Sequence, residues 1–300
     1  MRLRGCGTAL VTPFTVTGDV DLAALGRLVE WQITEGIDFL VPLGSTGEAQ
    51  TLDEAERDRV VATVLEAAAG RVPVMAGATS NDTARAVVET RRLCSLGVDY
   101  ILTATPYYNK PTQAGLLAHF EAVANASLKP VCLYNVPGRT GVNLKPETAL
   151  ALAEHDNIVA IKEASGDLAQ IIEIIRHQPE SFAVLSGDDW LAAAVILMGG
   201  QGLISVASNE VPRAMTALVT AALIGDVKET RQLQYRLTPL MNANFLESNP
   251  IPVKAALHAM GKIENVLRLP LVPLSKHHLP TLLGALREAG VEALAHSPAA

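Results

Sequence analysis

The sequence between residues 100 and 136 decides the fold class. YILTAT (100–105) is a short apolar run, AGLLAHFEAVANA (114–126) has helical periodicity, and VCLYNV (131–136) is a second apolar run. Near-continuous apolar strands are typical of a parallel sheet whose two faces are both covered. The same alternation recurs along most of the chain. The other strand-like runs are Cys6–Val11, Ile37–Leu43, Val72–Ala76, Ile158–Lys162, Ala183–Gly187 and Gly202–Val206. Eight such units in a row predict an α/β fold, a (β/α)8 TIM barrel.

Helical patterns separate the strands and then continue alone. Between strands they include Leu22–Thr34, Glu54–Ala69 and Thr83–Leu96. After the eighth strand only helical segments follow, at Pro212–Leu223, Val227–Phe245, Val253–Met260 and Leu279–Ala289. We therefore expect a catalytic barrel over residues 1–225 and a C-terminal helical domain over residues 226–300.

Composition excludes several classes of protein. A net charge of −7 over 300 residues argues against nucleic acid as a partner. Cys6, Cys94 and Cys132 lie far apart, which fits neither a zinc site nor a disulfide framework. No apolar run approaches the ~18–20 residues of a membrane span. We expect a cytoplasmic protein that does not contact membranes.

Lys162 is the sharpest candidate for chemistry. It follows Ile158–Ile161, so its side chain should emerge at the C-terminal mouth of the barrel, where barrel enzymes carry their reactive groups. Burial disfavours a charged ammonium and favours the neutral, nucleophilic amine. The alternative is a structural lysine, which either extends its amine to solvent at the strand end or is paired with Glu163.

Two tyrosines and a serine stand at neighbouring strand ends. The hydroxyls of Tyr134 and Tyr108 could shuttle the protons that imine chemistry requires, and Ser45 could link them into one relay. Each tyrosine taken alone fits a packing role better than a catalytic one.

The segment Gly44–Glu48 has the composition of an anion cradle. Its glycines allow the backbone N–H groups to turn inward, and Ser45 and Thr46 add hydroxyl donors for a carboxylate. A tight turn without a ligand is the alternative. We expect Glu48 to support the turn rather than act as a base, and the planar fork of Arg139 suits a second carboxylate.

Other polar features indicate no cofactor. Asp188 and Asp189 read as caps at a helix start rather than an acid pair. No phosphate loop, dinucleotide fingerprint or metal-ligand pattern is present. We therefore expect neither a cofactor nor a metal.

Beyond these features, the chain resembles the dihydrodipicolinate synthase branch of the N-acetylneuraminate lyase family, the class I pyruvate aldolases, over nearly its whole length. The matching segments are Val11–Phe14, Gly44–Glu48, Pro106–Pro111, Tyr134–Gly141, Ile161–Ala164, Ser186–Asp189, Gly202–Val206 and Asn249–Lys254.

The resemblance implies a specific reaction and site. Pyruvate and L-aspartate 4-semialdehyde would condense through a Schiff base on Lys162, a lyase reaction of lysine and diaminopimelate biosynthesis. Tyr134 would transfer protons in a relay with Ser45 and Tyr108, and the residue matching Tyr108 reaches a neighbouring subunit in this family. A homo-oligomer is therefore expected, a tetramer built as a dimer of dimers. The substrate-binding residues would be Thr46, Arg139, Ile204 and Gly187.

The sequence departs from the family pattern at two places. The relay position of Ser45 is often threonine in the synthases, and serine leaves its hydroxyl less restrained. The positions that match a lysine-binding regulatory pocket carry Ala49, Glu54, Arg57 and Arg85, beside Asn81 and Tyr107. Arginine would repel the lysine amine, so we expect weak or absent feedback inhibition.

Two alternative functions stay open from the sequence. One is another pyruvate-dependent aldolase of the same family, a lyase for sugar acids or hydroxy-oxo acids. The other is a binding barrel without catalysis, which the fold by itself does not exclude.

Overall fold

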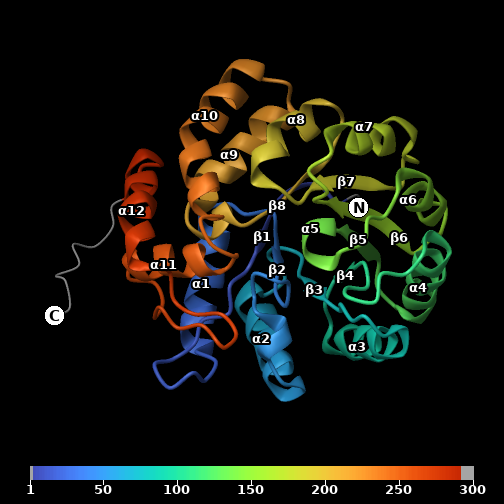
Figure 1. Ribbon diagram of the computed structural model, residues 1–300, viewed down its shortest axis with the longest axis horizontal. Helices are drawn as coiled ribbons and strands as arrows, with labels where there is room; N and C mark the ends of the chain where they lie inside the picture. Colours follow the sequence, from blue (N-terminus) through green and yellow to red (C-terminus); the bar gives the residue numbers. More distant parts are fainter. Residues whose placement is uncertain (1–2, 292–300) are drawn as a thin grey trace.

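A computed structural model describes residues 3–291 of the chain. Residues 292–300, the end of the expected C-terminal domain, lie outside this description. Figure 1 looks into a ring of strands surrounded by helices, with α10–α12 on one side.

The eight predicted strands are confirmed, and all of them run parallel. Their order is β2-β1-β8-β7-β6-β5-β4-β3, and a parallel bridge between Leu40 and Val74 joins the two ends of the sheet into a closed barrel. The strands are β1 (Gly5–Ala9), β2 (Phe39–Val41), β3 (Met75–Gly77), β4 (Tyr100–Ala104), β5 (Val131–Asn135), β6 (Ile158–Glu163), β7 (Ala183–Ser186) and β8 (Gly202–Ser205). Strand β2 is shorter than predicted because Pro42 lacks an N–H donor and Leu43 has a φ of 58°.

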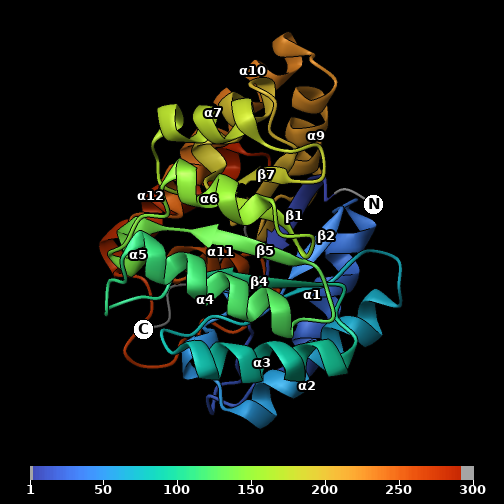
Figure 2. The same ribbon diagram turned by 90° about the vertical axis from the view of Figure 1, so that its right-hand side faces the viewer.

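Helices cover the outside of the barrel. Figure 2 views it from the side on which α4 and α6 lie over the strands. The covering helices are α1 (Leu22–Thr34), α2 (Glu54–Ala68), α3 (Thr83–Leu96), α4 (Gln113–Ala126), α6 (Pro146–Ala153), α7 (Leu168–His177), α8 (Ala192–Leu197) and α9 (Pro212–Leu223). Several begin directly after a capping side chain, namely Asp21, Asp53, Asp82, Thr112 and Asp167. A carboxylate or hydroxyl there accepts from a free N–H of the first turn, so the helix starts are readable in the sequence.

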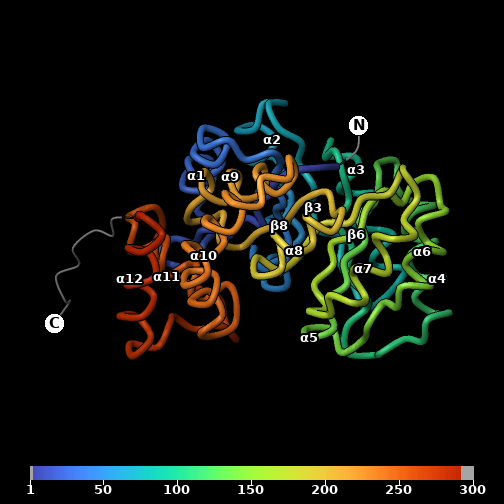
Figure 3. Tube along the Cα trace, turned by 90° about the horizontal axis from the view of Figure 1, so that it is seen from above, coloured from blue at the N-terminus to red at the C-terminus, as the bar shows by residue number. Residues whose placement is uncertain are grey.

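The last three helices form a layer beside the barrel. They are α10 (Val227–Ala243), α11 (Ile251–Ala259) and α12 (Leu279–Glu288), and α10 packs against both α9 and α12. Figure 3 shows α11 and α12 at one end of the molecule, with α10 between them and the barrel. We propose the domain boundary at residues 225 and 226, since Asp226 caps the start of α10. Among the described residues, no helix is long and apolar enough to cross a membrane.

The core has two layers because strand side chains alternate in direction. Cys132, Tyr134 and Ala160 belong to the cluster inside the barrel, whereas Leu133 and Ile161 pack against the helices. Lys162 follows Ala160 by two residues, so the alternation turns its side chain toward the barrel interior.

Candidate functional site

The C-terminal ends of five strands, β2 and β5–β8, meet around one cavity at the mouth of the barrel. Its volume is about 560 Å³, which suits a small molecule. Its lining includes six of the eight predicted site residues, namely Ser45, Thr46, Tyr134, Arg139, Lys162 and Gly187. An adjoining cavity shares Ser45, Tyr134 and Arg139 and extends toward Tyr107.

Lys162 and Tyr134 form the centre of the site. They are register partners on β6 and β5, and the Nζ atom of Lys162 lies 4.3 Å from the centroid of the Tyr134 ring. Only 5% of the lysine is exposed. The amine is therefore enclosed, with an aromatic face on one side and the cavity on another.

Glu163 is not the partner of Lys162, so the alternative of a lysine paired with Glu163 is wrong. Its buried carboxylate accepts from the Asn135 Nδ2 atom at 3.0 Å and from the Ser165 N–H at 2.7 Å. Burial raises the pKa of Glu163, and these donors partly oppose the shift. Because Asn135 and Glu163 are register partners, this contact outside the barrel holds β5 and β6 in the register that pairs Tyr134 with Lys162 inside.

Gly187 provides the space that the lysine side chain occupies. A Cβ atom at this position would lie 2.8 Å from the Ala164 Cβ atom and 3.0 Å from the Lys162 Cε atom. Any larger residue would therefore crowd the amine from the β7 side.

The Gly44–Glu48 turn is held partly by its own backbone. The N–H groups of Gly47 and Glu48 donate to the carbonyls of Gly44 and Ser45, at 3.1 and 3.2 Å. These two donors are thus used within the turn, in contrast to the expected cradle of inward N–H groups. Ser45 and Thr46 are the polar residues of the turn that line the cavity with Lys162.

Asn249 is a site residue that the sequence analysis did not single out. Its Nδ2 atom donates to the Thr46 hydroxyl at 2.8 Å, and its carbonyl accepts from Arg139 Nη2 at 3.0 Å. It lies just before α11, so it joins the C-terminal region to two predicted binding residues. The sequence feature that could have identified Asn249 is its place in the segment Asn249–Lys254, which is one of the segments that resemble the family.

Two predicted site residues lie away from the cavity. Tyr108 is 87% exposed with a φ of 74°, so one chain by itself does not assemble a relay through both tyrosines. Ile204 is fully buried in the cluster inside the barrel and is not among the residues that line the cavity.

The prediction of two capping aspartates is half right. The Asp188 side chain accepts from the Trp190 N–H at a short 3₁₀ helix, as a cap does. Asp189 is buried instead and accepts from the N–H groups of Val206 and Ala207, directly after β8. Burial raises the pKa of Asp189, and the connection after β8 supplies the donors that a buried carboxylate needs.

The fold and the site together define a class. The protein is a (β/α)8 barrel with a buried lysine at the strand ends, an arrangement typical of enzymes that use an amine as a nucleophile. Residues 2–289 match the dihydrodipicolinate synthetase family, and the chain belongs to this family.

Known proteins are similar to this chain in sequence and structure over almost its full length. A 4-hydroxy-tetrahydrodipicolinate synthase of Koribacter versatilis is 54% identical over 97% of this chain and 97% of its own length. One of Acidobacterium capsulatum is 54% identical over 92% of both chains. The solved structure of the chloride-inhibited dihydrodipicolinate synthase of Acinetobacter baumannii, in complex with pyruvate, has 44% identity and a TM-score of 0.95. It covers 96% of this chain and 99% of that one. The resemblance predicted from the sequence is confirmed. The activity is that of a 4-hydroxy-tetrahydrodipicolinate synthase, a lyase of lysine biosynthesis.

Proposed function

We propose that Lys162 forms a Schiff base with pyruvate and that the resulting enamine adds to L-aspartate 4-semialdehyde. The observation that carries this proposal is the enclosed Lys162 amine, 4.3 Å from the Tyr134 ring centroid in a cavity that also exposes hydroxyl groups. The solved complex of the Acinetobacter relative with pyruvate supports the choice of donor substrate.

The steps balance without a redox partner. The Nζ atom of Lys162 attacks C2 of pyruvate, and the ketone oxygen leaves as water to give the imine. Loss of a proton from C3 gives the enamine, whose C3 bonds to the aldehyde carbon of the acceptor while the aldehyde oxygen takes a proton. The acceptor amine then attacks C2, releases Lys162 and closes the ring of 4-hydroxy-tetrahydrodipicolinate.

We assign the proton transfers to Tyr134, with Ser45 as its relay partner. Tyr134 belongs to the strand beside Lys162, and both Tyr134 and Ser45 line the same cavity as the amine. A positioned hydroxyl of this kind contributes about 10²–10⁴-fold to such steps.

Thr46, Gly187 and Arg139 bind the substrates in this proposal. Thr46 receives the pyruvate carboxylate, Gly187 leaves room beside the imine, and the guanidinium of Arg139 receives the acceptor carboxylate. Ile204 does not line the cavity, so we assign it an indirect role, packing in the barrel interior below the residues that do.

We further propose that Tyr108 completes the relay in a neighbouring copy, within a homotetramer that is a dimer of dimers. Its 87% exposure and left-handed backbone present the ring outward from its own chain. A cytoplasmic location is proposed as well, because Cys6, Cys94 and Cys132 are all free thiols.

Borohydride reduction in the presence of pyruvate tests the imine. One reduced pyruvate should be found on the peptide that contains Lys162, and pyruvate should be consumed rapidly only when the semialdehyde is added. Trapping without consumption would retain the imine and refute the acceptor, and trapping on another lysine would refute the proposed site.

A further inference from the structure

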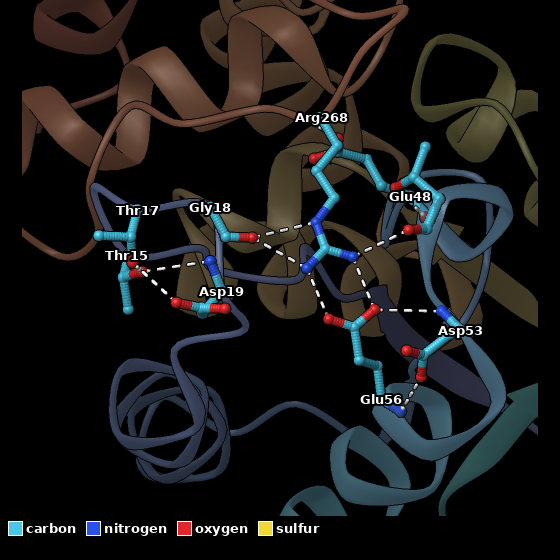
Figure 4. Close-up of polar contacts among 9 residues, drawn as sticks. Thr15, Thr17, Gly18, Asp19, Glu48, Asp53, Glu56 and Arg268 are labelled. Atoms are coloured by element: carbon cyan, nitrogen blue, oxygen red, sulfur yellow. Dashed lines mark hydrogen bonds and ion pairs between the residues drawn. The ribbon is translucent and has the colours of Figure 1, made fainter.

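Two cations from the C-terminal region reach the loops that carry the site. Lys254 lies on α11, and Arg268 lies in the extended segment between α11 and α12. Both contact the ring of Phe14 in the loop after β1, at 4.1 and 4.6 Å from its centroid. Figure 4 shows Arg268 between Gly18 of that loop and Glu48 and Glu56, which follow β2.

Lys254 is fully buried and its charge is paired. Its Nζ atom donates to Glu48 Oε1 at 2.6 Å and to the Thr12 carbonyl at 3.0 Å. Burial lowers the pKa of Lys254 to about 8, against the opposing effect of Glu48. A buried pair of this kind contributes little net stability compared with apolar packing, although breaking it by removing one partner is costly. The effect of the Lys254–Glu48 pair on the position of the loops that it joins is therefore more informative than its contribution to stability.

Arg268 binds the second oxygen of the Glu48 carboxylate. Its backbone N–H donates to Glu48 Oε2 at 3.1 Å. Its guanidinium makes a bidentate pair with Glu56, at 2.6 Å to each oxygen, and also donates to the carbonyls of Gly18 and Thr51. The arginine thereby ties the loop after β1 to the start of α2.

These contacts act on the turn that carries Ser45 and Thr46. Glu48 ends this turn with a φ of 51°, a conformation uncommon for a residue other than glycine. The turn is held at three successive residues, because Asn249 donates to Thr46, Thr12 donates to the Gly47 carbonyl at 2.7 Å, and Lys254 holds Glu48.

We infer that Glu48 and Lys254 are positioning residues, whose buried contact holds the Ser45–Thr46 turn where it can receive pyruvate. Neither residue is assigned a contact with substrate. The inference rests on the proposed function, because it assumes that pyruvate binds beside Lys162.

The test measures imine formation with Lys254→Met and Glu48→Gln. Methionine keeps an unbranched chain but removes all three donors, and glutamine keeps the shape of Glu48 but places an N–H₂ group against one of two donors. Each variant should raise the pyruvate concentration for half-maximal borohydride trapping at least about tenfold, since small misplacements of binding groups are costly. Lys262→Met is the matched control. Lys262 lies 3.6 Å from the centroid of the Trp31 ring on α1, and its loss should leave trapping unchanged.

A double variant separates positioning from stability. Glu48→Gln with Lys254→Met removes the unpaired buried charge, so its Tm should exceed that of Lys254→Met alone. Its half-saturating pyruvate concentration should nevertheless stay raised, because the contact that places the turn is still absent. A purely structural pair would instead restore pyruvate dependence together with Tm.

The outcomes distinguish the inference from the function on which it rests. Wild-type protein that is not trapped by borohydride overturns both. Wild-type trapping with an unchanged pyruvate dependence in folded Lys254→Met or Glu48→Gln overturns the positioning role alone. Should Lys254→Met fail to fold, Glu48→Gln decides the question.

Discussion

The Lys162 amine faces the ring of Tyr134 at 4.3 Å because the two residues are register partners on neighbouring strands. One step along each strand, Asn135 and Glu163 form a hydrogen-bonded pair on the opposite side. The contact between Asn135 and Glu163 helps to fix the register of β5 and β6. That register in turn places Tyr134 beside Lys162. This relationship makes the roles of both inner residues separable by substitution.

Replacing the amine should abolish the chemistry. Lys162→Ala is expected to lower kcat by at least about a thousandfold, because none of the other described residues that line the cavity carries an amine. Steady-state pyruvate consumption measures the loss, and circular dichroism checks that the barrel is intact. Residual activity within tenfold of wild type would contradict the role of Lys162.

Removing only the tyrosine hydroxyl should slow proton transfer and preserve packing. In Tyr134→Phe the ring that faces Lys162 remains, so we expect Tm to change little and kcat to fall about 10²–10⁴-fold. The measurement is kcat together with the KM for pyruvate. A raised KM with an unchanged kcat would show that Tyr134 only binds substrate.

A methyl group at Gly187 should crowd the lysine. Gly187→Ala places its Cβ atom 3.0 Å from Lys162 Cε, so we expect a loss of roughly tenfold in kcat/KM and about 1–3 kcal/mol of stability. Gly284→Ala on α12, where an added Cβ meets nothing within 4 Å, is the matched control and should keep full activity. Equal behaviour of the two variants would remove the steric argument.

The buried acid Glu210 should make stability depend on pH. Burial raises the pKa of Glu210 well above its ordinary value, and the charge of Asp189 adds to the shift. Folding therefore favours the protonated form, so stability is greatest below the ordinary pKa of a glutamate and falls as pH rises toward the raised pKa.

Glu210→Gln mimics the protonated form and keeps an oxygen that can accept from Asn244, as Glu210 does at 2.7 Å. Near pH 5 we expect the Tm of the variant to lie within a few degrees of wild type, with a difference in the free energy of unfolding of about 1 kcal/mol or less. At pH 9 we expect the variant to have a higher Tm than wild type. Melting curves from pH 5 to 9 measure this effect. A parallel pH profile of the two proteins would show that Glu210 is charged in the folded state.

Feedback inhibition by lysine should be weak. Arg57 donates from Nε and Nη2 to the Ala49 carbonyl at 3.2 and 2.8 Å, and Ala49 lines the same cavity as Tyr107. This places the Arg57 guanidinium, which also pairs with Glu89 at 3.6 Å, near the expected regulatory position, where we expect its charge to oppose the amine of lysine. Activity should be unchanged by lysine at sub-millimolar concentration, and inhibition in that range would refute the prediction.

The barrel could be predicted from sequence patterns that involve only residues close together along the chain. Apolar runs predicted the eight strands, and helical periodicity predicted the starts of α1 and α3 at Leu22 and Thr83, where the structure shows Asp21 and Asp82 as caps. The position of Lys162 at the end of a predicted strand also predicted that its side chain emerges at the mouth of the barrel.

Contacts between distant segments were decided only by the tertiary structure. Glu48 and Lys254 are 206 positions apart, and so no periodicity or spacing connects them. The same holds for Thr46 and Asn249, and for the separation of the adjacent residues Asp188 and Asp189 into a cap and a buried acceptor. Secondary structure follows from neighbours along the chain. A binding turn is instead placed by whichever donors the closed barrel and the C-terminal helices bring to it, and packing in three dimensions determines which donors those are.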